Sequence, residues 1–111
     1  MATATFVHDG SSIDYTPSAA VAAGDVVVQA DLIGVARTPI AANALGSLAV
    51  RGVFDVPKAT GGGSAIAVGS TVYWDATNKV ATTTAAGNKL LGKTIKAAAD
   101  ADAIVRVRLS Q

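Results

Sequence analysis

The sequence contains no cysteine and no glutamate among its 111 residues, and it carries little charge. The lack of cysteine excludes disulfides, thiolate metal sites and a cysteine nucleophile. Charged residues make up 15% of the chain and the net charge is +1, so electrostatics favour neither nucleic acid nor an acidic membrane as a partner. No apolar run approaches the roughly 18 residues of a membrane span, and the first residues do not form a signal peptide. We expect a protein that is soluble and intracellular when it is made.

The length predicts one domain with one modest core. Half of the residues are hydrophobic, but only five are aromatic, namely Phe6, Tyr15, Phe54, Tyr73 and Trp74. Two explanations fit a surface with so few charges. Either partners cover much of it, or the chain is a stable, threonine-rich β protein.

Short apolar stretches separated by Gly, Asp, Asn and Pro dominate the chain and predict β-strands. We expect strands at 5–8, 13–16, 26–29, 32–37, 48–56, 71–74, 79–82 and 104–109, with 71–74 and 79–82 forming a hairpin. The clearest one, 48–56, alternates apolar and polar residues, which is typical of a half-buried strand. Helix signals are weak, at 39–44 and 96–101 only. The predicted fold is all-β: a small single-domain β-barrel or β-sandwich over residues 11–111, with at most short helical turns and a candidate flexible arm over residues 1–10.

The chain also contains a short internal repeat. Residues 21–28 (VAAGDVVV) resemble residues 66–73 (IAVGSTVY), and residues 32–36 (LIGVA) resemble residues 90–94 (LLGKT). The second copy has an extra hairpin between its two parts.

One stretch, GNKLLGKT at residues 87–94, fits the phosphate-binding P-loop pattern G-x-x-x-x-G-K-[ST]. A P-loop needs a buried parallel strand before its first glycine and a helix that begins at Lys-Thr. The residues before Gly87 are Ala- and Thr-rich, and only 17 residues follow Thr94, ending in a predicted strand. The repeat aligns Gly92 with Gly34, which favours a glycine that serves a β-strand or bulge. We therefore expect no nucleotide cofactor.

No other residues assemble a catalytic or metal-binding pattern. His8 is the only histidine, and a surface position near the Asp9-Gly10 turn is the simpler interpretation. Asp100-x-Asp102 lacks the third ligand and the glycine of a calcium loop. Tyr73 and Trp74 are adjacent on a strand, so one should point inward and the other outward. The sequence thus predicts no enzyme, no catalytic residue, no cofactor and no metal.

Six stretches, in this order, resemble a known family: 6–10 with 13–15, 23–28, 32–36, 52–58, 72–75 with 79–83, and 106–109. Together they are similar to the capsid cement, or decoration, proteins of tailed phages and prophages of the DUF2190 type. Members have often carried a label suggesting a RecA-like recombinase, and the GKT stretch shows how such a label could arise. The likeness runs from about Phe6 to Leu109.

The resemblance implies a β-rich, β-tulip-like protein of the virion, made in the cytoplasm of the host bacterium. It would bind the outside of the expanded head as a homotrimer and clamp subunits of the major capsid protein, without contact to nucleic acid or membrane. An alternative is a phage head or tail adaptor or a ligand-binding β module. A nucleotide-dependent enzyme is a distant third.

The N-terminal arm, Ala2 to Val7, is a candidate for adding an edge strand to a capsid sheet. Thr and Phe suit an extended strand, so Thr3, Thr5, Phe6 and Val7 are the candidate capsid-contact residues. The alternative is that these residues form the first strand of the domain or a frayed end.

Overall fold

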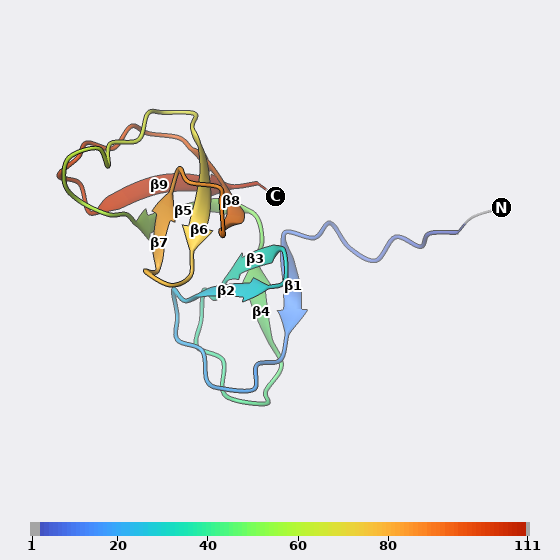
Figure 1. Cartoon of the computed structure of the whole chain (residues 1–111). Helices are drawn as coiled ribbons and strands as arrows, with labels where there is room; N and C mark the ends of the chain where they lie inside the picture. The colour runs from blue at the N-terminus through green and yellow to red at the C-terminus, as the bar shows by residue number, and fades with distance from the viewer. Residues whose placement is uncertain (1–2, 111) are drawn as a thin grey trace.

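The computed structural model describes residues 3–110 and shows a protein built of strands, turns and loops (Figure 1). No helix occurs between residues 3 and 110, so the all-β prediction is confirmed, and the weak helix signals at 39–44 and 96–101 correspond to no helix. The strands are β1 (Ser12–Tyr15), β2 (Val26–Gln29), β3 (Leu32–Val35), β4 (Gly46–Ala49), β5 (Gly52–Pro57), β6 (Thr71–Asp75), β7 (Val80–Thr82), β8 (Lys89–Thr94) and β9 (Ile104–Leu109).

The strands form two antiparallel sheets, in the orders β1-β4-β3-β2 and β5-β9-β8-β6-β7 (Figure 1). Neither sheet closes into a barrel, so the barrel alternative was wrong. Residues 33–35 of β3 are buried on both faces of the strand, which fits its apolar sequence. Ile33 and Val35 on β3 join the main core, whose other buried members include Val72, Leu91 and Val107 from the second sheet. One core therefore links the two sheets.

The stretch 48–56 is not one strand, as we expected, but parts of two. Strand β4 ends at Ala49 in the first sheet, and β5 begins at Gly52 in the second. The chain crosses between the sheets at this point, and Gly52 takes a φ of 119°, a conformation that favours glycine. The predicted alternation survives the break, because Leu48 and Val56 are buried whereas Asp55 is exposed.

The predicted strand at 5–8 was also wrong. Residues 3–10 belong to neither sheet, and pairing of β1 with β4 starts at Ser12. A strand needs a neighbouring edge to satisfy its backbone groups, and within residues 3–110 no strand pairs with this segment. It leaves the body as an extended arm (Figure 1).

The other strand predictions are confirmed. The hairpin of β6 and β7 pairs Trp74 with Ala81, both buried, and the turn between the strands spans residues 76–79. Trp74 points inward, whereas Tyr73 is half-buried. On β9, Val105, Val107 and Leu109 are buried and the two arginines between them are exposed.

The internal repeat corresponds to a repeat of the fold. The first sheet has the order β1-β4-β3-β2, and the second sheet begins with the matching order β5-β9-β8-β6. Strand β7 is an extra strand at the end of the second sheet. The pairing registers agree: Val27 lies opposite Gly34 in the first copy, and Val72 lies opposite Gly92 in the second. The sequence repeat is therefore confirmed as structural.

Backbone hydrogen bonds outside the strands repeat as well. The Gly24 N–H donates to the Ala36 carbonyl at 2.6 Å, and the Gly69 N–H donates to the Thr94 carbonyl at 2.8 Å. Each copy also closes an isolated two-way bridge, Val21 with Ile40 in the first and Ile66 with Ala98 in the second. These matching bonds allow each feature of one half to be compared with its counterpart in the other.

Candidate docking surfaces

The described part of the arm, residues 3–10, carries the predicted capsid-contact residues. Thr3, Thr5, Phe6 and Val7 are all exposed, with 80% of Phe6 and 81% of Val7 open to solvent. Two adjacent large apolar side chains held away from the body present a surface that water disfavours, and such positions commonly mark contact sites. Their exposure fits a role in docking and places none of them in the core.

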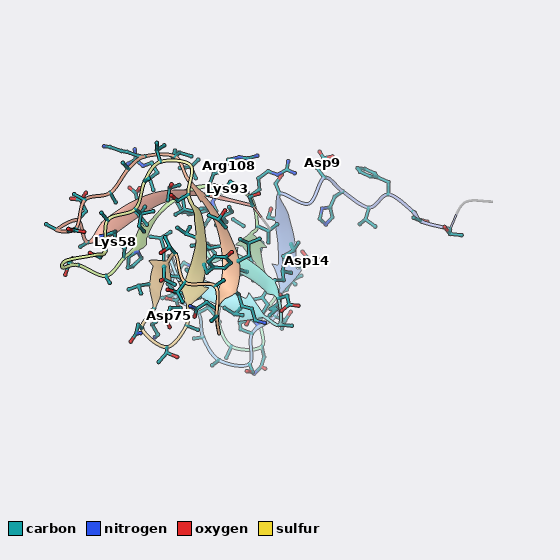
Figure 2. The ribbon with its side chains drawn as sticks, turned by 45° about the horizontal axis from the view of Figure 1, so that its top comes forward. Asp9, Asp14, Lys58, Asp75, Lys93 and Arg108 are labelled. Carbon is teal, nitrogen blue, oxygen red and sulfur yellow. The ribbon has the colours of Figure 1, made fainter. Side chains whose placement is uncertain are left out.

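A local hydrogen bond lies at the base of the arm. The Gly10 N–H donates to Nδ1 of His8 at 2.9 Å, and both His8 and Asp9 are exposed; Asp9 is labelled in Figure 2. His8 is thus a surface residue, as the sequence suggested.

A groove of about 450 Å³ lies beside β2, one of the two edge strands of the first sheet. Val26 and Val28 line one side, Pro57 and Trp74 contribute apolar surface, and Ala76 belongs to the turn between β6 and β7. No local sequence pattern predicts this groove, because its walls come from both sheets. It combines an open strand edge with a largely apolar recess, which Asp25 and Lys79 also line.

The outer face of the second sheet carries exposed basic side chains. Lys93 and Arg108 lie opposite each other on β8 and β9, as Figure 2 shows, and both are exposed. The matching positions in the first sheet, Val35 and Ala49, are buried. The same face of the repeat is therefore a core surface in one copy and an open surface in the other.

A bidentate ion pair joins Asp55 and Arg106 on this outer face. Arg106 Nε and Nη2 donate to the two carboxylate oxygens of Asp55 at 2.8 and 3.1 Å. The hydrogen bonds from Arg106 hold the pKa of the Asp55 carboxyl below its usual range, and Asp55 raises the pKa of Arg106 further. Exposed apolar side chains flank the pair, with Val53, Ile95 and Ile104 each about half open to solvent.

The P-loop-like stretch forms β8 and not a phosphate-binding turn. Lys93 and Thr94 lie in the strand, and residues 95–103 form no helix. Thr94 is buried, and its hydroxyl donates to the Ala67 carbonyl at 2.7 Å and accepts from the Ser70 N–H at 3.0 Å. With no helix N-terminus behind Lys-Thr, the geometry that holds phosphates is missing here.

The two acids of Asp100-x-Asp102 brace loops. Asp100 Oδ1 accepts from the Ala65 N–H, and Asp102 Oδ2 accepts from the Ala99 N–H, each at 2.8 Å. Over residues 3–110, no group of three or more His, Cys, Asp or Glu side chains is placed to hold a metal ion. That part of the chain also has no helix with the length and apolarity to cross a bilayer.

These observations describe a β protein with an exposed apolar arm and an open sheet edge. A family model of phage cement proteins matches residues 7–109. The chain belongs to the phage cement protein family. No curated protein and no solved structure matches it.

Family membership confirms the resemblance seen in the sequence and gives this cement protein a role on the phage capsid, in association with capsid proteins. It also points to a structural, non-enzymatic role. The match begins at Val7, so residues 3–6 of the arm lie outside it.

Proposed function

We propose that this cement protein binds the outer surface of the expanded phage head and stabilises the head by bridging neighbouring subunits of the major capsid protein. The observation that carries the proposal is the exposure of Phe6 and Val7 on an unpaired arm in a chain of the cement family. The arm, residues 1–10, and the β domain, residues 11–111, then have separate tasks. The domain sits on the shell, and the arm attaches it to a subunit.

The physical basis is burial of apolar surface combined with multiplicity. Moving a phenylalanine side chain out of water contributes about 1.5–3 kcal/mol, and main-chain pairing of an added strand would hold the arm in register. Thr3, Thr5, Phe6 and Val7 are the proposed capsid contacts. Each contact is weak by itself, but several contacts per oligomer add through effective concentration, which is the reason we propose a homotrimer as the functional form. No catalysis, nucleic acid or membrane is needed.

The test is co-sedimentation of the purified protein with expanded heads that lack it and with unexpanded shells. We expect saturable binding to the expanded heads alone, at a copy number set by the lattice. Absence of binding to either shell would contradict the proposal and favour an adaptor or a ligand-binding module.

The arm is tested by deleting residues 2–7 and, more gently, by Phe6→Ser. Both variants should keep the melting temperature of the intact chain, because residues 3–9 are exposed, and both should lose head binding. His8→Ser, on the same arm, is the matched control and should bind as the wild type does. Full binding by the truncated chain would exclude the arm as the contact.

A further inference from the structure

One strand edge is open in the first copy of the structural repeat, whereas the equivalent edge in the second copy is paired with another strand. In the second sheet, β6 lies between β8 and β7. In the first sheet, the equivalent strand β2 pairs with β3 and ends the sheet, and no strand within residues 3–110 pairs with its other edge. The first copy of the repeat therefore lacks the strand that β7 supplies in the second.

The backbone groups on this edge point outward. The Ala36 N–H donates to the Asp25 carbonyl at 2.9 Å, so the backbone carbonyl of Asp25 faces the β3 side. Backbone groups alternate between the two edges of a strand, which directs those of Val26 and Val28 toward the open edge. An unpaired edge of this kind is a template for another strand.

The groove beside β2 supplies a place for a side chain of such a strand. Val28, which is 36% exposed, borders it, as do Pro57 and the buried Trp74. Ala76, in the turn after β6, lines the groove from the second sheet. In Figure 1 this turn approaches β2. Main-chain pairing along an edge together with one apolar pocket is how extended segments are recognised.

The chain's own arm is poorly placed to fill this position. It enters the first sheet at β1, which is the edge opposite β2 in the order β1-β4-β3-β2, and it points away from the body (Figure 1). The arm is also the proposed contact with the capsid protein. For a single protomer to bridge two capsid subunits, it needs a second contact besides the arm, and the β2 edge provides one.

We propose that the open edge of β2 receives an extended segment of the major capsid protein as a fifth strand, antiparallel as β7 is to β6, with one of its apolar side chains in the groove. This inference rests on the proposed function and identifies the second capsid contact of each protomer. One capsid subunit holds the arm, and another inserts a strand beside β2.

The experiment measures binding to expanded heads by co-sedimentation for the wild type and two pairs of full-length variants. Ala76→Arg fills the groove from its far wall, and Thr77→Arg, the next residue in the same exposed turn but not part of the groove, is its control. Val28→Pro removes an outward N–H and blocks strand addition, and Val28→Ile keeps that N–H as its control. Melting temperatures of all four establish that each is folded.

We expect Ala76→Arg and Val28→Pro to bind about tenfold more weakly or not at all. Ala76→Arg occupies the pocket, and Val28→Pro removes a main-chain hydrogen bond. The two control variants should bind as the wild type does. Wild-type binding by Ala76→Arg would overturn the inference while leaving the cement function intact. Failure of the wild type itself to bind would instead contradict the proposed function. A change in the sedimentation coefficient of the free protein with Ala76→Arg but not Thr77→Arg would assign the edge to a second copy of this chain and also overturn the inference.

Discussion

Gly34 and Gly92 occupy the same position in the two copies of the repeat, and each allows a neighbouring strand to come close. A Cβ atom on Gly34 would lie 2.7 Å from the Leu48 Cβ, and one on Gly92 would lie 2.0 Å from the Arg108 carbonyl oxygen. Gly92 is the second glycine of the P-loop-like stretch. The close approach of β9 to β8 explains its presence without any reference to phosphate.

Gly92→Ala should destabilise the protein strongly. The added methyl group meets backbone, which cannot rotate away as a side chain can, so β8 and β9 must separate. Overpacking of this kind costs about 1–3 kcal/mol or more, and chemical denaturation would measure it. Gly62→Ala is the control, because a Cβ there meets nothing within 4 Å. Equal stability of the two variants would contradict the close approach.

Thr94→Val should also destabilise the fold, although it preserves shape. The buried Thr94 hydroxyl accepts a hydrogen bond from the Ser70 N–H and donates one to the Ala67 carbonyl, and both bonds are partly buried. Leaving such groups without partners costs up to about 1–3 kcal/mol. Lys93→Met, at the exposed neighbouring position, should change stability little. If Thr94 served a phosphate site instead, its loss would matter for ligand binding and not for folding.

ATP with Mg²⁺ should leave the melting temperature of the protein unchanged. A ligand that binds only the folded state raises the melting temperature with its concentration, and the Lys-Thr pair of β8 has no helix N-terminus to present to phosphates. A concentration-dependent rise that Lys93→Met abolishes would restore the nucleotide-binding interpretation.

Lys58→Met should destabilise two loops at once. Lys58 is 4% exposed, and its Nζ donates to the carbonyls of Ala59, Ala99 and Asp102 at 2.8–3.0 Å. Hydrogen bonds to charged groups contribute about 1.5–3 kcal/mol each, and methionine leaves three carbonyls without this donor. We expect a loss of at least about 2 kcal/mol in denaturation and faster proteolysis within 59–65 and 96–103. Unchanged proteolysis would show that the loops do not depend on Lys58.

The strands that could be predicted from sequence are those with period-two alternation and turn residues at both ends. The hairpin of β6 and β7 and the final strand β9 have both features. The break at Gly52 could not be predicted, because alternation continues across it and only the partner strands differ. The arm was misassigned for a related reason: Phe6 and Val7 have strand propensity, but strand propensity cannot supply a pairing edge.

The candidate site was predictable only in part. The apolar arm is visible in the sequence as a local feature. The groove beside β2 depends on Trp74 and Val28 being brought together from the two sheets, and no local pattern encodes that. The repeat was the one sequence feature that pointed to it, since the extra hairpin in the second copy marks the strand that the first copy lacks.

Acid should weaken the turn between β6 and β7 (Figure 2). The Asp75 carboxylate accepts hydrogen bonds from Asn78 Nδ2 at 2.8 Å and from the N–H groups of Asn78 and Thr77 at 3.1 and 3.0 Å. These hydrogen bonds lower the pKa of the Asp75 carboxyl, and those from Asn78 have the largest effect. Because the folded pKa lies below the unfolded value of about 3.9, the contribution of Asp75 is fully present above about pH 5 and is lost as the pH falls through the folded pKa.

The corresponding measurement is the urea midpoint of unfolding between pH 7 and pH 2.5 for the wild type and Asp75→Asn. The wild-type midpoint should stay level from pH 7 to about 5 and decrease below about 4. Asp75→Asn should begin lower and decrease less, so that the two curves converge in acid, because the variant has no carboxylate to protonate at this position. Asp9→Asn, on the exposed arm, should follow the wild type. Parallel curves for the wild type and Asp75→Asn would show that the charge of Asp75 does not stabilise the turn.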